Sequence, residues 1–403
     1  MADTVLNVLL HGQLVGTLVR LGGDRILFSF ADDHIENDNR PTLSLSFQDE
    51  LGDLLLDQHP TRRRAPPFFA NLLPEGRLRS YLAAHAGVNE TRDFPLLQAL
   101  GGDLAGAVQV VPSEPGVVSE LARETDGAAP VGPLRFSLAG VQLKLSALEA
   151  ATGGLTIPAH GAGGDWILKL PSPVYDHNPE NEHAMMTLAK QVGIETPEVR
   201  LVHTGQVQGL PTDLGHLAGN ALAVKRFDRT PHGPVHIEDF AQVFRQYPER
   251  KYERASYRNI AEVLWNEAGE EAIDQFLRRL AFSALIGNAD MHLKNLSLIY
   301  PDRVSPTLAP AYDLLSTIVH LPDETMALKL GRSKRWRDLT LDQIRWFAAH
   351  AAIPERLAVQ AVAETVLRFR AIWSAEAAHI GLANAGRRAI DRHVASLPII
   401  REV

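Results

Sequence analysis

The feature that most constrains this chain is a run of polar residues between two apolar segments. NADMHLKN follows FLRRLAFSALIG and precedes LSLIY, all within residues 276–300. The run brings four polar side chains into six consecutive positions: Asp290, His292, Lys294 and Asn295. Burying a charge without a partner costs several kcal/mol or shifts its pKa. The fold must therefore supply these side chains with partners or a ligand.

Helical spacing precedes the polar run, and strand alternation follows it. In EEAIDQFLRRLAFSALIG, apolar residues fall on one helical face: Ile273, Phe276, Leu277, Leu280 and Ala284. This spacing predicts a core-facing helix that ends at Gly287. LSLIY alternates as a strand, PDR predicts a turn, and VSPTLAP is then its hairpin partner. The polar run is therefore predicted to lie in a loop between buried elements, where function is common.

The spacing inside this loop is typical of phosphoryl transfer. Asp290 precedes Asn295 as the base precedes the metal-binding Asn in the D-x-x-x-x-N loop of protein kinases. Asp313, in APAYDLLS beyond the predicted hairpin, has the position of a second metal-binding Asp. Lys294 would add positive charge near the transferred group, and His292 is a further catalytic candidate. The alternative is structural: Asp290 caps a turn, while His292 and Asn295 satisfy backbone groups of the loop.

Two charged residues upstream complete the set that a kinase needs. DWILKLP places Lys169 in a short apolar run, where it would grip the phosphates. NPENEHAMMTLAKQ places Glu182 near the start of the next helix, where it would orient that lysine. Two alternatives stay open. Lys169 would lie on an edge strand with its ammonium in water, and Glu182 would interact only with the helix dipole.

A phosphate-covering loop and a hinge are predicted on either side of the lysine strand. FSLAGVQLKLSA has strand-like flanks around a candidate loop made of Ala139, Gly140, Val141 and Gln142. With one glycine it is a weak phosphate-loop signal, and a tight hairpin is the alternative. ALAVKRFDR suits a strand that leads into an adenine-binding hinge, with Lys225 and Phe227 as candidate nucleotide contacts.

Composition excludes other chemistries. Without cysteine, the chain has no disulfides, thiolate catalysis or cysteine-based metal sites. Its net charge of −8 argues against nucleic-acid binding through its overall field. The start MADTVLNVLLHGQLVG lacks the pattern of a signal peptide, and no stretch has the roughly 18 uncharged apolar residues of a membrane span. We therefore expect a cytoplasmic protein without membrane contact.

One basic stretch, FRQYPERKYERASYR at residues 244–258, falls outside these motifs. Its cations are Arg245, Arg250, Lys251, Arg254 and Arg258. We expect a plain solvated face, and the alternative is a contact with an acidic protein surface or with bound nucleic acid.

Taken in order, the segments resemble those of the HipA family, the toxin kinases of bacterial toxin–antitoxin pairs, over essentially the whole chain. NEHAMMTLAKQVGIETPEVRL, ALAVKRFDR, IGNADMHLKNLSL and LAPAYDLLS are similar to the family's C-terminal kinase domain. GQLVGTL, FFANLLPEG and GGDLAGAVQ are similar to its small N-terminal domain. The resemblance implies a serine kinase that uses ATP and Mg²⁺. It also implies that Asp290 is the catalytic base, that Asn295 and Asp313 hold Mg²⁺, and that Lys169 contacts the ATP phosphates.

The resemblance further implies how the kinase is regulated. Residues 224–227 correspond to the hinge, and Ser137 corresponds to a serine that the family autophosphorylates. A phosphate there would repel those of ATP, expel the loop and switch the kinase off. The chain departs from the commoner family pattern at Leu143 and Lys225, where acidic residues are frequent. The implied partners are a small helix-turn-helix antitoxin, operator DNA reached only through it, and a protein substrate such as an aminoacyl-tRNA synthetase.

The expected fold is α+β, distantly related to protein kinases and phosphoinositide kinases. A small, mostly-β N-terminal domain is predicted at 1–112, followed by a linker rich in Pro, Gly and acidic residues at 113–133. A bilobal kinase-like domain then has its N-lobe-like part at 134–228, with the phosphate loop, lysine strand and hinge. A helical C-lobe at 229–403 carries the catalytic loop and the metal-binding Asp.

Two other functions remain as alternatives. A metal-dependent hydrolase would use Asp290, His292, Asp313 and His320 to activate a water, which leaves the Asp-to-Asn spacing and Lys169 unexplained. A catalytically silent, kinase-like scaffold would act with its antitoxin as a co-repressor. The presence of every expected catalytic residue counts against that scaffold.

Overall fold

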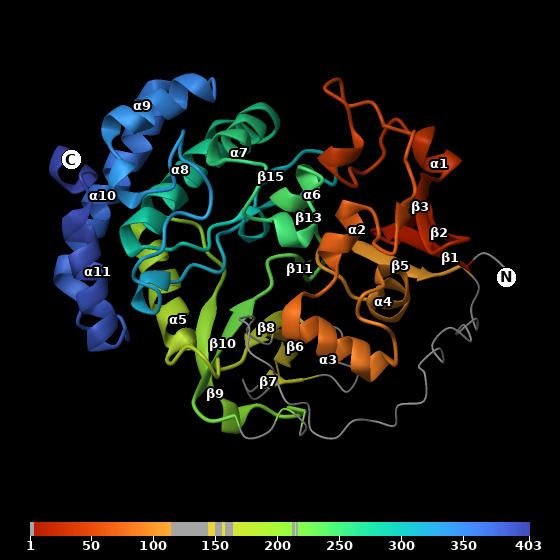
Figure 1. Cartoon of the computed structure of the whole chain (residues 1–403), viewed down its shortest axis with the longest axis horizontal. Helices are drawn as coiled ribbons and strands as arrows, with labels where there is room; N and C mark the ends of the chain where they lie inside the picture. Colours follow the sequence, from red (N-terminus) through yellow and green to blue (C-terminus); the bar gives the residue numbers. More distant parts are fainter. Residues whose placement is uncertain (1–3, 114–143, 150–154, 158–163, 212–213, 215–216) are drawn as a thin grey trace.

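The computed structural model describes residues 4–113, 144–149, 155–157, 164–211, 214 and 217–403. Its fold is mixed, with a β-rich N-terminal region and a helical C-terminal region, which confirms the predicted fold class. In Figure 1 the N-terminal sheet and the C-terminal helices lie at opposite ends, with a second sheet between them. Within the described residues, no helix is long and apolar enough to cross a bilayer. The domain boundaries given above stay predictions.

The first sheet has five strands in the order β4-β3-β2-β1-β5. Its strands are β1 (Thr4–Leu10), β2 (Gln13–Leu21), β3 (Arg25–Phe30), β4 (Thr61–Arg62) and β5 (Val108–Pro112). Alternate residues of β1, namely Leu6, Val8 and Leu10, are buried because successive side chains of a strand point to opposite faces. They pack in one apolar cluster with Phe28 of β3 and Phe69.

Short helices accompany this sheet: α1 (Asp32–Ile35), α2 (Pro67–Leu72), α3 (Gly76–Ala86) and α4 (Asp93–Leu100). The sequence predicts one helical segment through FFANLLPEGRLRSYLAAHAG, whereas the structure has two helices with a break at Leu73. A residue before proline disfavours helical geometry, and Leu73, which precedes Pro74, has an extended ψ of 148°. As predicted, Gly87 ends α3, with φ 66°.

The second sheet has the order β7-β6-β8-β10-β9. Its strands are β6 (Lys144–Glu149), β7 (Leu155–Thr156), β8 (Trp166–Lys169), β9 (Val199–His203) and β10 (Asn220–Lys225), and helix α5 (Asn178–Val192) contacts β9 and β10. Strand β8 pairs with β6 on one side and with β10 on the other. Lys169 therefore lies on an interior strand and is only 4% exposed, so the edge-strand alternative is wrong.

The third sheet carries the segment that follows the polar run. It consists of β13 (His236–Asp239), β14 (Ser297–Tyr300) and β15 (Thr307–Leu308), and β14 pairs with both neighbours. The predicted hairpin after the polar run is therefore present. A separate short ribbon joins β11 (Arg229–Thr230) to β12 (Gly233–Pro234).

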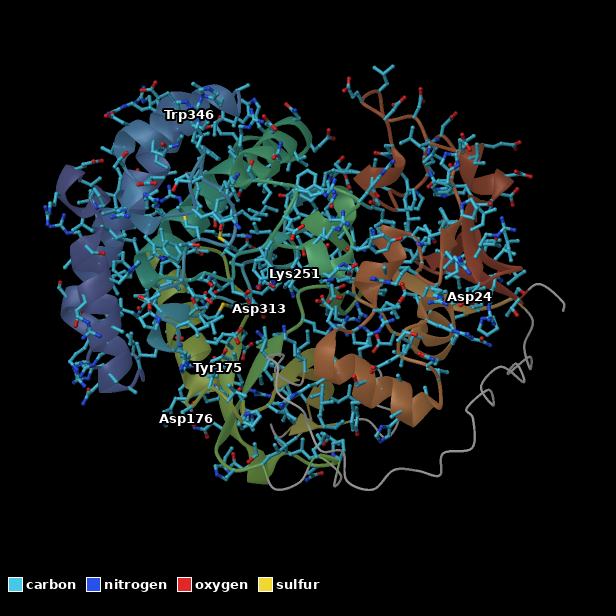
Figure 2. The ribbon with its side chains drawn as sticks, in the orientation of Figure 1. Asp24, Tyr175, Asp176, Lys251, Asp313 and Trp346 are labelled. Carbon is cyan, nitrogen blue, oxygen red and sulfur yellow. The ribbon has the colours of Figure 1, made fainter. Side chains whose placement is uncertain are left out.

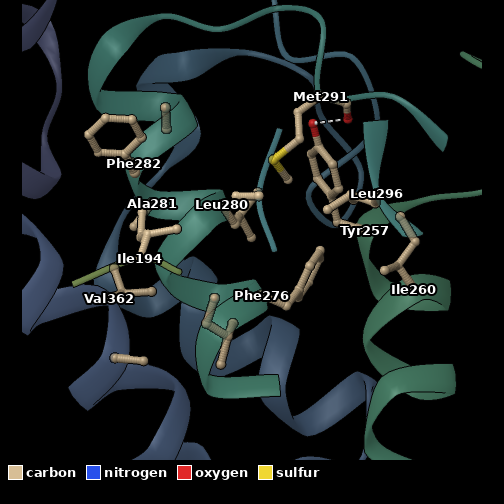
Figure 3. Close-up of a cluster of buried hydrophobic side chains, with 14 of the residues drawn as sticks. Ile194, Tyr257, Ile260, Phe276, Leu280, Ala281, Phe282, Met291, Leu296 and Val362 are labelled. Carbon is tan, nitrogen blue, oxygen red and sulfur yellow. Dashed lines mark hydrogen bonds between the residues drawn. The ribbon is translucent and has the colours of Figure 1, made fainter. Parts of the chain in front are cut away.

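The helical region is built around α8 (Gly269–Ile286), the helix predicted before the polar run. The remaining helices are α6 (Phe240–Val243), α7 (Tyr257–Val263), α9 (Leu341–His350), α10 (Glu355–Glu376), α11 (Asn384–Ser396) and α12 (Ile399–Glu402). Figure 3 shows Phe276 and Leu280 of α8 in a buried cluster with Tyr257 and Met291, where the Tyr257 hydroxyl donates to the Met291 carbonyl. Gly287 ends α8 with φ 65°, a backbone conformation that glycine tolerates best.

Glu238 of β13 connects the N-terminal region to the third sheet. Its carboxylate accepts hydrogen bonds from Ser44 Oγ (2.5 Å), Leu45 N (3.0 Å) and Tyr300 Oη (2.5 Å). Although these donors favour the charged form, complete burial raises the pKa of Glu238 to about 7. This carboxyl group thus links two regions of the chain and holds a proton near neutral pH.

We predict a pH-dependent contribution of Glu238 to stability. Because the carboxyl group binds its proton more tightly folded than unfolded, the free energy of unfolding should fall as the pH rises from about 4.5 to about 7. Relative to Glu238→Gln, the wild type should lose on the order of 2 kcal/mol between about pH 5 and about pH 8 in urea unfolding experiments. His236, whose pKa burial lowers to about 4, acts in the opposite direction but equally in both proteins. Parallel stability curves for the two proteins would contradict the prediction.

Candidate active site

A cavity of about 650 Å³ opens among the second sheet, the third sheet and the loop after α8. Nine of the residues predicted from the sequence line it: Lys169, Glu182, Lys225, Phe227, Asp290, His292, Lys294, Asn295 and Asp313. Figure 2 shows Asp313 near the centre of the molecule, where it lines the cavity together with Lys251. The predicted phosphate loop lies outside the described residues: Ala139, Gly140, Val141, Gln142 and the proposed phosphoacceptor Ser137.

A buried ion cluster forms one wall of the cavity. The Lys169 ammonium of β8 donates to Glu182 of α5 and to Asp313, which follows β15. Lys144 of β6 contacts the other oxygen of Asp313, with Nζ and Oδ2 2.8 Å apart. Burial acts to raise the pKa of Asp313, but the two ammonium groups outweigh it and hold that pKa well below its usual range. Asp313 is therefore ionised, and each of its two carboxylate oxygens is paired with a lysine ammonium group.

The backbone at Asp313 supports a functional role. Its φ is 54°, a left-handed conformation that is uncommon for residues other than glycine. Such conformations are held by the surrounding structure and are concentrated at functional sites.

Burial raises the pKa of the neighbouring Glu182, while Lys169 pulls it down. Glu182 is thus a partner of Lys169, not only a residue near a helix dipole.

The loop after α8 presents Asp290 and Asn295 to the same cavity. Asn295 Nδ2 donates to the Asp290 carbonyl (2.8 Å), which fixes the amide and leaves Oδ1 for a cation. The hydroxyl of Tyr252 donates to the Asp290 carboxylate. Burial raises the pKa of Asp290, against the effect of this hydrogen bond. The Asp290 carboxylate thus accepts a hydrogen bond from a hydroxyl group inside the cavity.

His292 has the environment of a structural residue. Its side chain is buried, Nδ1 accepts from Lys294 N (3.2 Å), and Nε2 lies 3.6 Å from Asp290 Oδ1. Burial, with a contribution from Lys251, lowers the pKa of His292 to about 3. The imidazole is therefore neutral at physiological pH and caps the loop, as the structural alternative expects, while it also lines the cavity, so its catalytic role stays a prediction.

Lys294 lines the cavity and contacts the N-terminal region there. Its ammonium donates to Asn71 O (2.9 Å) and Asn71 Oδ1 (3.0 Å), and it lies 3.2 Å from Asp239 and 3.4 Å from Glu75. Glu75 also pairs with Lys251 at 3.1 Å. Although burial acts to raise the pKa of Glu75, Lys294 and Lys251 lower it. The Lys294 ammonium, which was predicted to add positive charge near the transferred group, is thus paired with the carboxylates of Glu75 and Asp239.

The prediction of a solvated face for residues 244–258 is wrong in part. Lys251 and Tyr252 line the cavity, and Arg245 donates to the Ser46 carbonyl of the N-terminal region. Glu75 and Asn71 belong to the family-like segment FFANLLPEG and Tyr252 to the basic stretch, but nothing in these patterns predicts their contacts with Lys294 and Asp290, which join distant segments.

The hinge strand bounds the apolar end of the cavity. Ile167, Val224, Phe227 and Ile237 line that end, and the Phe227 ring lies 5.8 Å from that of Tyr312. These side chains would suit a flat, apolar ring such as adenine. Lys225 is exposed, with its ammonium 5.9 Å from the Trp166 ring.

The oxygen ligands in this cavity suit a kinase-type Mg²⁺ site better than the metal site of a hydrolase. Asp313 and Asn295 offer a carboxylate and an amide oxygen, and Mg²⁺ typically takes one or two such protein ligands plus substrate phosphates. Among the described residues, no group of three or more His, Asp or Glu side chains is arranged to hold a metal ion. His320 contacts the Tyr175 ring. The four residues of the hydrolase alternative line the same cavity, but they are not grouped to hold a metal ion.

A lysine–glutamate pair, a D-x-x-x-x-N loop and a second aspartate around one cavity define a kinase-like site. Models of the HipA N-terminal domain and the HipA-like C-terminal domain match residues 6–111 and 136–373. The chain therefore belongs to the HipA family.

Named relatives agree with this assignment. The chain is 51% identical to putative kinase Y4dM of Sinorhizobium fredii, over 99% of this chain and 98% of that protein. It is 27% identical to the serine/threonine-protein kinase toxin HipA of Shewanella oneidensis, over 81% and 82% of the two chains. A chain in the solved complex of HipA, HipB and operator DNA from Shewanella oneidensis MR-1 shares the fold, with a TM-score of 0.72 at 24% identity, covering 98% of this chain and 96% of that one.

We predict that Glu75 and Lys251 are energetically coupled. In a double-mutant cycle of Glu75→Gln and Lys251→Met, urea unfolding should give a coupling energy of about 1–2 kcal/mol, because both side chains are largely buried and pair at 3.1 Å. The exposed pair Asp342–Arg345 is the control and should give less than about 0.5 kcal/mol. Equal coupling in the two pairs would contradict a structural role for the Glu75 contact.

Proposed function

We propose that this protein is an ATP- and Mg²⁺-dependent serine/threonine protein kinase that acts as the toxin of a toxin–antitoxin pair. The observation that carries the proposal is the meeting of Lys169, Glu182 and Asp313 in the cavity that Asp290 and Asn295 also line. Phosphoryl transfer requires these residue types in this combination. They come from separate segments and meet only in the folded chain.

Each residue of the cavity has a task in this reaction. Asp290 would accept the proton of the attacking hydroxyl, and the Tyr252 contact supports this because a hydroxyl reaches that carboxylate. Lys169 and Lys144 would bind the phosphates, while the apolar end would hold the base. Mg²⁺, held by Asp313 and Asn295, would supply charge neutralisation for the phosphates.

The proposed partner is a small helix-turn-helix antitoxin. A chain of similar fold occurs in a complex of HipA, HipB and operator DNA. The net charge of −8 supports contact with DNA only through the antitoxin. The proposed substrate is a protein, such as an aminoacyl-tRNA synthetase, with Ser137 as the site of autophosphorylation, and both follow from the family resemblance.

The test is phosphorylation measured by mass spectrometry after incubation with ATP and Mg²⁺. The wild type should gain a phosphate that maps to Ser137, and Asp290→Asn should reduce its rate by about 10²-fold or more because the base is lost. The exposed Asp57→Asn is a matched control and should react as the wild type does. Equal phosphorylation of Asp290→Asn and wild type would overturn the assignment of the base. If neither protein is phosphorylated, and Ser137 is unmodified beforehand, the kinase proposal fails.

A further inference from the structure

A buried arginine beside the loop after α8 has two guanidinium nitrogens without a hydrogen-bond partner among the described residues. Arg279 of α8 is 2% exposed, and its Nε and Nη2 have no hydrogen-bond partner among the described residues. The preceding Arg278 is different, because it donates to Asp274 (2.7 Å) and Glu364 (2.9 Å). A buried arginine that donates no hydrogen bond to a carboxylate needs an explanation, since buried polar groups are nearly always satisfied.

The side chain of Asn288 contains a second hydrogen-bond donor without a partner, and it borders the same small cavity as Arg279. Asn288 is buried, and its Nδ2 has no hydrogen-bond partner among the described residues. The orientation of this amide is fixed, because its Oδ1 accepts from Asp290 N at 2.9 Å. The nitrogen must therefore point away from the catalytic loop. Two side chains thus supply N–H donors, and neither has an acceptor.

The two side chains line a common small cavity. Its volume is about 10 Å³, close to the least space that holds a single water-sized occupant. Much of its remaining wall is apolar and includes Met291 and Leu296, which Figure 3 shows beside α8. Asn295 and Asp313 also border it, but the Asp313 carboxylate accepts from Lys144 and Lys169 of the main cavity. The site therefore suits a monatomic acceptor.

Charge favours an anion over water. Burial lowers the pKa of Arg279 to about 10, so the guanidinium stays charged at neutral pH. Glu195 interacts with Arg279 electrostatically, but no carboxylate of the described residues lies within ion-pair distance of the guanidinium. A water molecule would satisfy the donors but add no negative charge beside the guanidinium in the interior, where a charge without a close partner is costly. We propose that this cavity is a binding site for a monatomic anion, chloride under physiological conditions, held by Arg279 and Asn288.

The anion would stabilise the conformation of the loop after α8, which carries Asp290. It would hold Asn288 through Nδ2, and the same amide accepts from the Asp290 backbone through Oδ1. One amide group therefore connects the anion to the candidate base. Binding is expected whether or not the protein is a kinase, since the site uses none of the proposed phosphate contacts.

Bromide provides a direct test on the full-length protein. Crystals grown with sodium bromide in place of chloride should show an anomalous difference peak between Arg279 and Asn288. Asn288→Asp should abolish the peak, because its carboxylate supplies the negative charge while still accepting from Asp290 N. A water molecule at this position without an anomalous peak in the wild type would overturn the proposal.

Thermal unfolding in solution gives an independent measurement. Replacing sodium gluconate by sodium chloride at constant ionic strength should raise the Tm of the wild type in a saturable manner, as expected for a ligand that binds only the folded state. Arg278→Met should retain this shift, whereas Arg279→Met and Asn288→Asp should lose it. If Arg279→Met does not fold, Asn288→Asp decides. A Tm of the wild type that does not depend on chloride would contradict the proposal.

Discussion

The structure depends above all on the way in which it buries one lysine. Lys169 lies on an interior strand and retains its charge only because Glu182 and Asp313 meet it there. Removing one partner from a buried ion pair typically costs about 3–5 kcal/mol. The requirement to keep both carboxylates therefore fixes β8, α5 and the segment after β15 relative to one another. The wall of the cavity results from that requirement, and Lys144 extends it through the second oxygen of Asp313.

The N-terminal region is part of the same electrostatic arrangement. Asn71 of α2 and Glu75, which precedes α3, contact Lys294 of the loop after α8. Glu238 accepts from Ser44 on the other side of the third sheet. The loop that carries the candidate base is thus stabilised by contacts with the N-terminal region and by packing against α8. A substitution in either set of contacts should affect Asp290 even where the substituted residue does not contact Asp290.

Local patterns in the sequence predicted the site better than its surroundings. The apolar periodicity of α8 and of β14 predicts both elements and the loop between them. The spacing of Asp290 and Asn295 indicates phosphoryl transfer, so the sequence also predicts which loop residues line the cavity. The contacts of Glu75 and Tyr252 could not be predicted, because each joins segments that are far apart in the chain; FFANLLPEG, which contains Glu75, indicates the family but not this contact. Arg279 sits on the apolar side of a helix beside Arg278, and the sequence does not distinguish the solvated arginine from the buried one. Pro74 is a local signal for the break between α2 and α3, but the residues on both sides of it have helical spacing, which by itself predicts one continuous helix.

The most direct test of the central claim is the affinity for ATP measured by calorimetry with and without Mg²⁺, in the wild type and in Asp313→Asn. Asp313 and Asn295 are the proposed metal ligands, and Lys169 is proposed to hold the phosphates. The account therefore predicts that Mg²⁺ strengthens ATP binding to the wild type and that Asp313→Asn largely removes this gain. An equal gain in both proteins, or no ATP binding by the wild type, would contradict it.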